Sequence, residues 1–169
     1  MAENRINMVS LLDIGLLTGT TSKIVVLGKG FSELSEDWGP DSDSKCYIDE
    51  KAASTTIKGY KFSANPTRDF ITDEVQDCIN TLLKKFPTGA ACETYYYRFF
   101  KSDIDTTTQT GDCIKVPVTV CPASAGGTGG DTLTTGIQIS GNGDPELGTI
   151  TIGANESGGA TYTWAKKTE

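Results

Sequence analysis

The stretch from Thr55 to Lys101, TTIKGYKFSANPTRDFITDEVQDCINTLLKKFPTGAACETYYYRFFK, predicts a strand, a helix and a second strand around which the rest of the chain is arranged. We expect one amphipathic helix over about residues 73–86. Thr72 is expected to cap its start, and Pro87 and Gly89 prevent its continuation. The apolar residues at helical spacing, which we expect to pack on a sheet, are Val75, Ile79, Leu82, Leu83 and Phe86.

An aromatic strand follows the helix, in the segment YYYRFF. Alternate side chains of a strand point to opposite faces, so Tyr95, Tyr97 and Phe99 lie on one face and Tyr96 and Phe100 on the other. Aromatic side chains on both faces need cover on both. We expect the helix to cover one face, and either a second sheet layer or a neighbouring subunit to cover the other.

Further short strands are predicted on both sides of this unit. Residues 6–12 and 23–27 are expected to form two strands, and the segments CIKVPVTVC, DTLTTGIQIS and TITI predict later ones. Pro117 cannot donate a backbone hydrogen bond, so its strand must lie at an edge or turn this nitrogen away from the partner. The pattern predicts a mainly β fold: an antiparallel β-sandwich or barrel with one flanking helix.

The chain is long enough for one domain with extensions. We expect residues 1–152 to form the sandwich domain, and residues 153–169 to form a C-terminal arm or hairpin through Tyr162 and Trp164. Residues 30–54 form a long segment rich in acids and serines, in which only residues 45–48 resemble a strand. Loops of this length are usually functional or disordered.

Composition excludes several classes of function. The net charge is −7 and the 15 basic residues are scattered, which argues against a surface that grips duplex DNA. The chain has no histidine, so imidazole-based catalysis and most zinc sites are excluded, and we expect neither an enzyme nor a cofactor. Five cysteines without a C-x-x-C pair favour a reduced protein. We expect no signal peptide and no membrane span.

Two segments leave an alternative open. GGTGGDTLT, residues 126–134, satisfies one calcium-binding nonapeptide, which would make a calcium-dependent binding or adhesion domain. The motif occurs once, and PASAGGTGG is more typical of a flexible linker. The acids of residues 33–50 lack the spacing of an EF-hand loop, which favours a solvated or partner-facing loop.

Tyr95, Tyr96 and Tyr97 beside Arg98 could stack bases, but the acidic chain favours core packing and a subunit contact.

The sequence resembles the tail tube protein, or major tail protein, of tailed bacteriophages. The segments that carry the resemblance are EDWGPDSDSKCYIDE, TTIKGYKFS, DEVQDCINTLLKKFPTG with YYYRFFKSD, and GIQISGNGDPELGTITI, between about Glu36 and Ile152. The order of the predicted elements is also similar, and ends in the turn GDPELGT at Gly143 to Thr149.

The resemblance implies a structural subunit that assembles with itself into six-membered rings stacked into a hollow tube for DNA delivery. It also implies contacts with tape measure and tail terminator or adaptor proteins, assembly in the bacterial host cytoplasm, a place in the virion tail, and no membrane. The acidic balance would let DNA pass without sticking. In that family the long loop and terminal arms reach the neighbouring ring. Here these are residues 30–54, 1–5 and 153–169. The residues we expect at contacts between subunits or rings are Phe31, Leu34, Trp38, Tyr47, Tyr96, Phe100, Tyr162 and Trp164.

Overall fold

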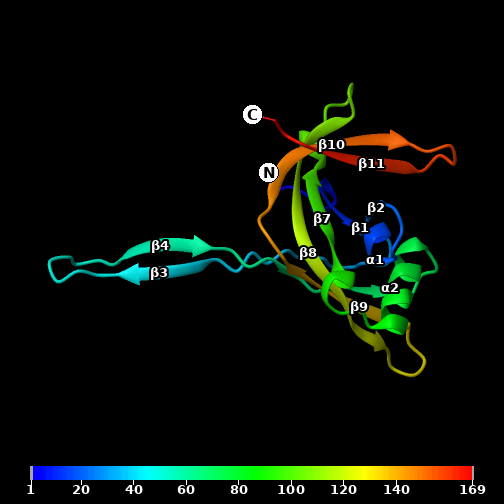
Figure 1. Cartoon of the computed structure of the whole chain (residues 1–169), viewed down its shortest axis with the longest axis horizontal. Helices are drawn as coiled ribbons and strands as arrows, with labels where there is room; N and C mark the ends of the chain where they lie inside the picture. The colour runs from blue at the N-terminus through cyan, green and yellow to red at the C-terminus, as the bar shows by residue number, and fades with distance from the viewer. Residues whose placement is uncertain (1, 169) are drawn as a thin grey trace.

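The computed structural model describes residues 2–168, which form a mainly β fold of antiparallel strands with one long helix (Figure 1). The main helix is α2, Glu74–Lys85, and α1, Ile14–Leu17, is a single turn. The strands are β1 Met8–Asp13, β2 Ile24–Val26, β3 Asp41–Lys45, β4 Ser54–Gly59, β5 Ser63–Ala64, β6 Thr67–Asp69, β7 Glu93–Phe100, β8 Thr110–Gly126, β9 Thr134–Gly141, β10 Glu146–Ala154 and β11 Ala160–Lys166. Short 3-10 turns occur at Arg5–Asn7, Gly89–Cys92 and Lys101–Asp103.

One large sheet carries the fold. Its strand order is β11-β10-β8-β7-β1-β2, with β9 paired to the second half of β8, and β5 and β6 paired to β9. The terminal strands β2 and β11 are not hydrogen-bonded to each other, so among the described residues the sheet does not close into a barrel. The antiparallel sandwich prediction is confirmed, and the barrel alternative is not.

Strand β8 is longer than predicted and changes partner at Pro117. Its first part pairs with β10 and its later part, from Val118 to Gly126, with β9. The Pro117 carbonyl accepts a 2.8 Å hydrogen bond from the Asn142 nitrogen. The nitrogen and oxygen of one strand residue point to the same side, so the missing N–H faces the gap between β9 and β10. The predicted linker was wrong in part, because PASAG belongs to β8.

The first apolar cluster lies between the sheet and α2. Val75, Ile79 and Leu82 are buried as predicted, and Leu83 packs against their cluster while partly exposed. The prediction for Phe86 was wrong: the helix ends there in a left-handed conformation (φ 44°) and the side chain is 66% exposed. The predicted cap was also wrong. Asp73, rather than Thr72, accepts the hydrogen bond from the Gln76 nitrogen, at 2.9 Å.

The second apolar cluster lies on the other face of the aromatic strand. The ring centres of Tyr97 and Trp164 are 6.4 Å apart, as are those of Phe99 and Tyr162. Both partners come from β11, which pairs with β10 along its length. This face was predicted to be covered by a second sheet layer or by a neighbouring subunit. The structure covers it with strands of the same chain, the C-terminal β10–β11 hairpin. Residues 160–166 therefore pack on the domain rather than standing free.

A buried ion pair joins the start of α2 to β6. The Arg68 side chain is 0% exposed and donates two hydrogen bonds to the Asp73 carboxylate, at 2.9 and 2.8 Å, and one to the Lys29 carbonyl at 3.1 Å. Gly30 passes close by, with φ +85°, and a Cβ there would lie 3.1 Å from the Arg68 guanidinium. The pair therefore holds β6, the Lys29–Gly30 loop and the helix start together.

This pair predicts a dependence of stability on acidity. The hydrogen bonds from Arg68 lower the pKa of Asp73 below its usual 3.8. A carboxyl whose pKa is lower in the folded state stabilises the fold above its unfolded pKa, and this contribution is lost as the pH falls through the folded pKa. We expect the gap in melting temperature between wild type and Asp73→Asn to shrink from neutral pH to below about pH 3. A gap that stayed constant in that range would contradict the prediction.

None of the helices within residues 2–168 is long and apolar enough to cross a membrane.

Candidate interaction surfaces

Strands β3 and β4 form a hairpin that projects from the domain, which we call the arm, residues 39–61 (Figure 1). The two strands form a separate sheet and pair from Asp41–Gly59 to Lys45–Ser54. The strand prediction for this segment was wrong, because residues 46–48 lie in the turn and β3 precedes them. β3 has no alternating apolar residues, so a hydrophobic pattern could not predict it. Its contacts with β4 are polar: Ser44 faces Thr55, and Asp43 pairs with Lys58.

The arm has no core of its own. Asp43 and Gly59 are partly exposed, and every other residue from 39 to 61 is exposed. A lone two-stranded hairpin is marginally stable in water, so a persistent arm of this kind needs a partner. Four exposed apolar side chains lie along it, and only the first was predicted as a contact residue: Tyr47, Ile48, Ile57 and Tyr60.

The base of the arm is fixed to the domain by aromatic contacts. Trp38 packs on Phe62, with ring centres 4.8 Å apart, and Phe62 on Tyr96, at 5.2 Å. The backbones of Asp37 and Ser63 exchange hydrogen bonds of 2.9 and 2.7 Å where the two chains leave the domain. The arm therefore leaves the domain at a fixed point.

A buried carboxylate reinforces this base. Glu36 accepts hydrogen bonds from the Tyr96 hydroxyl at 2.9 Å and the Trp38 indole at 3.2 Å, and the Arg98 Nε lies 3.4 Å from it. Burial, and then the Glu36 charge, raise the pKa of the Tyr96 hydroxyl. Tyr96 therefore stays protonated and donates. The role of Glu36 could not be predicted from the sequence, because its partners Tyr96 and Arg98 lie about 60 residues away in the chain.

The predicted contact residues fall into two groups. Tyr96 is fully buried in the first cluster, so its side chain cannot reach another subunit and its assignment to contacts was wrong. Leu34 is also buried in this cluster and keeps only a small exposed surface. Their apolar character serves the core. The others keep exposed surface but are distributed among different parts of the fold: Phe31 over Arg68, Trp38 at the base, Tyr47 at the tip, Phe100 beside Arg98, and Tyr162 and Trp164 on β11.

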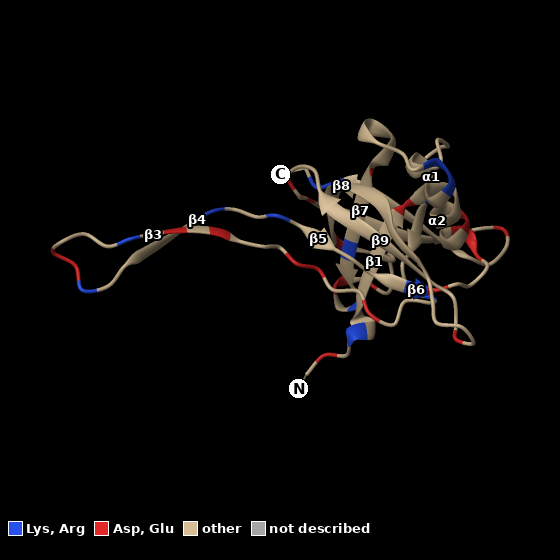
Figure 2. Ribbon diagram, turned by 90° about the horizontal axis from the view of Figure 1, so that it is seen from below, with Lys and Arg blue, Asp and Glu red and all other residues tan. Residues whose placement is uncertain are grey.

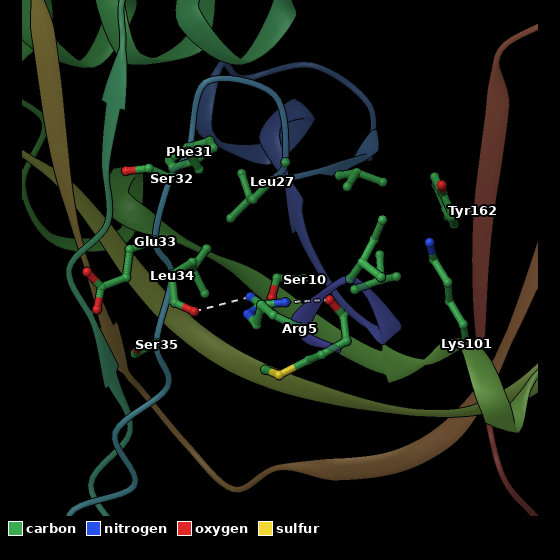
Figure 3. Close-up of a pocket in the computed structure, with 15 residues that line it drawn as sticks. Arg5, Ser10, Leu27, Phe31, Ser32, Glu33, Leu34, Ser35, Lys101 and Tyr162 are labelled. Carbon is green, nitrogen blue, oxygen red and sulfur yellow. Dashed lines mark hydrogen bonds between the residues drawn. The ribbon is translucent and has the colours of Figure 1, made fainter. Parts of the chain in front are cut away.

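A groove of about 540 Å³ lies beside the arm base, between residues 31–35 and the N-terminal end of β1 (Figure 3). Arg5 crosses its floor and donates to the carbonyls of Met8, at 2.5 Å, and Leu34, at 3.1 Å. Lys101 and Tyr162 form the opposite wall. Arg5 was predicted to lie in a terminal arm, but its two hydrogen bonds connect the N-terminal segment to the domain.

The described residues contain no group of three or more Asp, Glu or Cys side chains placed to bind a metal. The glycine-rich segment forms the β8–β9 turn, where the Asp131 nitrogen donates to the Thr128 carbonyl. All five cysteines are free. In Figure 2, acidic and basic residues are interspersed along the arm and over the domain.

Comparison with solved structures finds chains with a similar fold. A chain in the tail of an empty gene transfer agent (GTA) particle, with C6 symmetry, aligns with a TM-score of 0.61 at 10% identity, covering 86% of this chain and 98% of that one. The present protein therefore shares the fold of a chain from a tail particle. A chain in the virion of a native GTA particle also has this fold, with a TM-score of 0.58, 8% identity and the same coverage. No family model and no curated protein matches the sequence. At such low identity the tail-particle likeness establishes the fold alone.

Proposed function

We propose that this protein is a structural subunit of a phage-type tail, without enzymatic activity, which assembles with itself into six-membered rings stacked into a hollow tube. The single observation that carries the proposal is the arm, a solvent-exposed hairpin with a fixed base and no core. The shared fold supports it, because that fold occurs in a tail particle with C6 symmetry. The arm would contact the neighbouring ring.

The proposed tube would deliver DNA from the virion. A net charge of −7 supports this, because a negative wall repels phosphate and lets a duplex slide. As further partners we propose a tape measure protein, and terminator or adaptor proteins at the ends of the tube. Assembly would take place in the host cytoplasm before the tube joins the virion.

The oligomeric state of the full chain tests the proposal. Negative-stain microscopy of the concentrated protein is expected to show rings or tubes with six subunits per ring. Compact monomers at every salt concentration would count against the tube.

Removing the arm is expected to abolish stacking. The deletion should run from Asp41 to Gly59, closed by a short Gly-Ser turn, because Trp38 then stays packed on Phe62, and Phe62 on Tyr96. A longer deletion that begins near Ser32 would remove Leu34 and Glu36 from the core. We expect a cooperatively folded chain with unchanged circular dichroism of the domain and no tubes.

A deletion elsewhere controls for loop shortening. The β8–β9 turn at Gly127 to Gly130 is also exposed, and its removal is expected to leave tubes intact. If the chain without the arm formed tubes as readily as the wild type, the arm would not be the contact between rings.

A further inference from the structure

We propose, building on the proposed function, that the arm tip of one copy docks into the groove beside the arm base of the next copy. The tip is the turn of residues 46–53, and the groove is the one between residues 31–35 and the start of β1 (Figure 3). The occupant is thus a second copy of this chain, and its anchor is the pair Tyr47–Ile48.

The tip presents apolar surface that its own chain leaves uncovered. Tyr47 is 62% exposed and Ile48 is fully exposed. Exposed apolar side chains are common singly, but two at the end of a hairpin without a core form an anchor whose burial would be favourable. The Glu50 nitrogen donates to the Tyr47 carbonyl at 3.0 Å, which holds the turn that displays both side chains.

The groove offers a matching apolar lining. Ile6, Met8, Val26, Leu27 and Phe31 contribute to its walls. Its volume of about 540 Å³ lies within the range in which proteins bind compact apolar groups, about 300–1,000 Å³. Two adjacent side chains of an inserted turn fit a space of this size.

The charges of tip and groove are opposite. The tip carries Asp49 and Glu50 with one base, Lys51. The groove carries two bases, Arg5 and Lys101, with one acid, Glu33. Complementary charge around an apolar anchor fixes orientation and suppresses wrong partners. The two surfaces therefore complement each other in both polarity and sign.

The position of the groove explains why the contact must pass to another copy. Leu34 and Ser35 line the groove and Trp38 lies at the arm base, so groove and arm base are neighbours. The tip stands roughly 25 Å from the arm base, because the extended chain from Pro40 to Ile48 rises by about 3.3 Å at each residue. Because of this distance, the arm tip of one copy cannot reach the groove of the same copy. A tip-to-groove contact is thus heterologous, and it repeats into an open-ended stack instead of closing a pair.

Disulfide trapping tests this contact with the cysteine already present at the tip. Cys46 is exposed beside Tyr47, and Ser32 lines the groove and is exposed. In the full chain with Ser32→Cys, mild oxidation after assembly is expected to give a ladder of linked subunits, about tenfold more product than Lys84→Cys on α2, because docking raises the effective concentration of the two thiols. Adding Cys46→Ser should abolish the ladder.

A charge exchange gives a second, independent readout. Asp49→Lys and Lys101→Glu should each raise the concentration needed for tube assembly by about tenfold, because each places like charges together, and the double variant should recover most of this loss. Asp131→Lys, in the exposed β8–β9 turn, is the control for an added positive charge and is expected to leave assembly unchanged.

The outcomes separate this inference from the proposed function. Tubes that form normally without a Ser32→Cys ladder and without rescue by the double variant would overturn the docking site and leave the tube subunit standing. Failure of the wild type to assemble at any concentration would overturn both.

Discussion

Asp73→Ala is expected to lower the free energy of unfolding by about 3–5 kcal/mol, because it leaves a buried positive charge without its counterion. The Arg68 side chain is 0% exposed and gives two of its hydrogen bonds to this carboxylate. The Lys29 carbonyl alone would remain as a hydrogen-bond acceptor. The substitution also removes the cap of α2, which contributes about 1 kcal/mol.

The double variant Arg68→Met with Asp73→Ala distinguishes the stranded charge from simple loss of contacts. Methionine fills much of the space without a charge, so the double variant is expected to be more stable than Asp73→Ala alone. Urea unfolding followed by circular dichroism measures both. Asp77→Ala, an exposed acid in the same helical turn, should change stability by less than about 0.5 kcal/mol. A double variant less stable than the single one would contradict the argument.

Tyr96→Ala is expected to cost about 3–5 kcal/mol and to loosen the arm base. Tyr96 is 0% exposed, packs on Phe62 and donates to the Glu36 carboxylate at 2.9 Å. Tyr96→Phe keeps the ring and removes only the donor, so we expect a loss of about 1–3 kcal/mol. The difference between the two variants separates packing from the hydrogen bond.

Fluorescence of Trp38 provides a measurement specific to the arm base. In a Trp164→Phe background Trp38 is the single indole of the chain, and Tyr96→Ala should shift its emission toward that of exposed tryptophan before global unfolding. Tyr47→Ala, at the exposed tip, is the matched tyrosine control and should change stability by less than about 0.5 kcal/mol. An unchanged Trp38 signal in Tyr96→Ala would show that the arm base does not depend on this contact.

The α2 region shows where sequence periodicity succeeds and where it fails. Val75, Ile79 and Leu82 follow the helical period and are buried, because a helix of this length presents one stripe to whatever covers it. Phe86 continues the period beyond the end of the helix, so its side chain has no core to join. Caps depend on local backbone geometry, which is why the cap predicted at Thr72 lies one residue before the cap that forms, at Asp73.

The aromatic strand β7 also shows what sequence periodicity can predict and what it cannot. Alternation correctly assigned Tyr96 to one face and Tyr97 to the other, since strand geometry fixes the period at two. It left open whether a sheet layer or a neighbouring subunit covers the second face. The β10–β11 hairpin covers it through Trp164 and Tyr162, a contact between segments more than 60 residues apart in sequence, as between Tyr97 and Trp164.

The sequence by itself determined the β class, the single long helix and the two faces of the aromatic strand, because these follow from periods of a few residues. Only the tertiary structure decided that residues 39–61 stand out as an arm, that Glu36 and Tyr96 hold its base, and that a groove with Arg5 and Lys101 lies beside it. Grooves and anchored hairpins arise from long-range packing between distant segments, and no local period records which segments will meet.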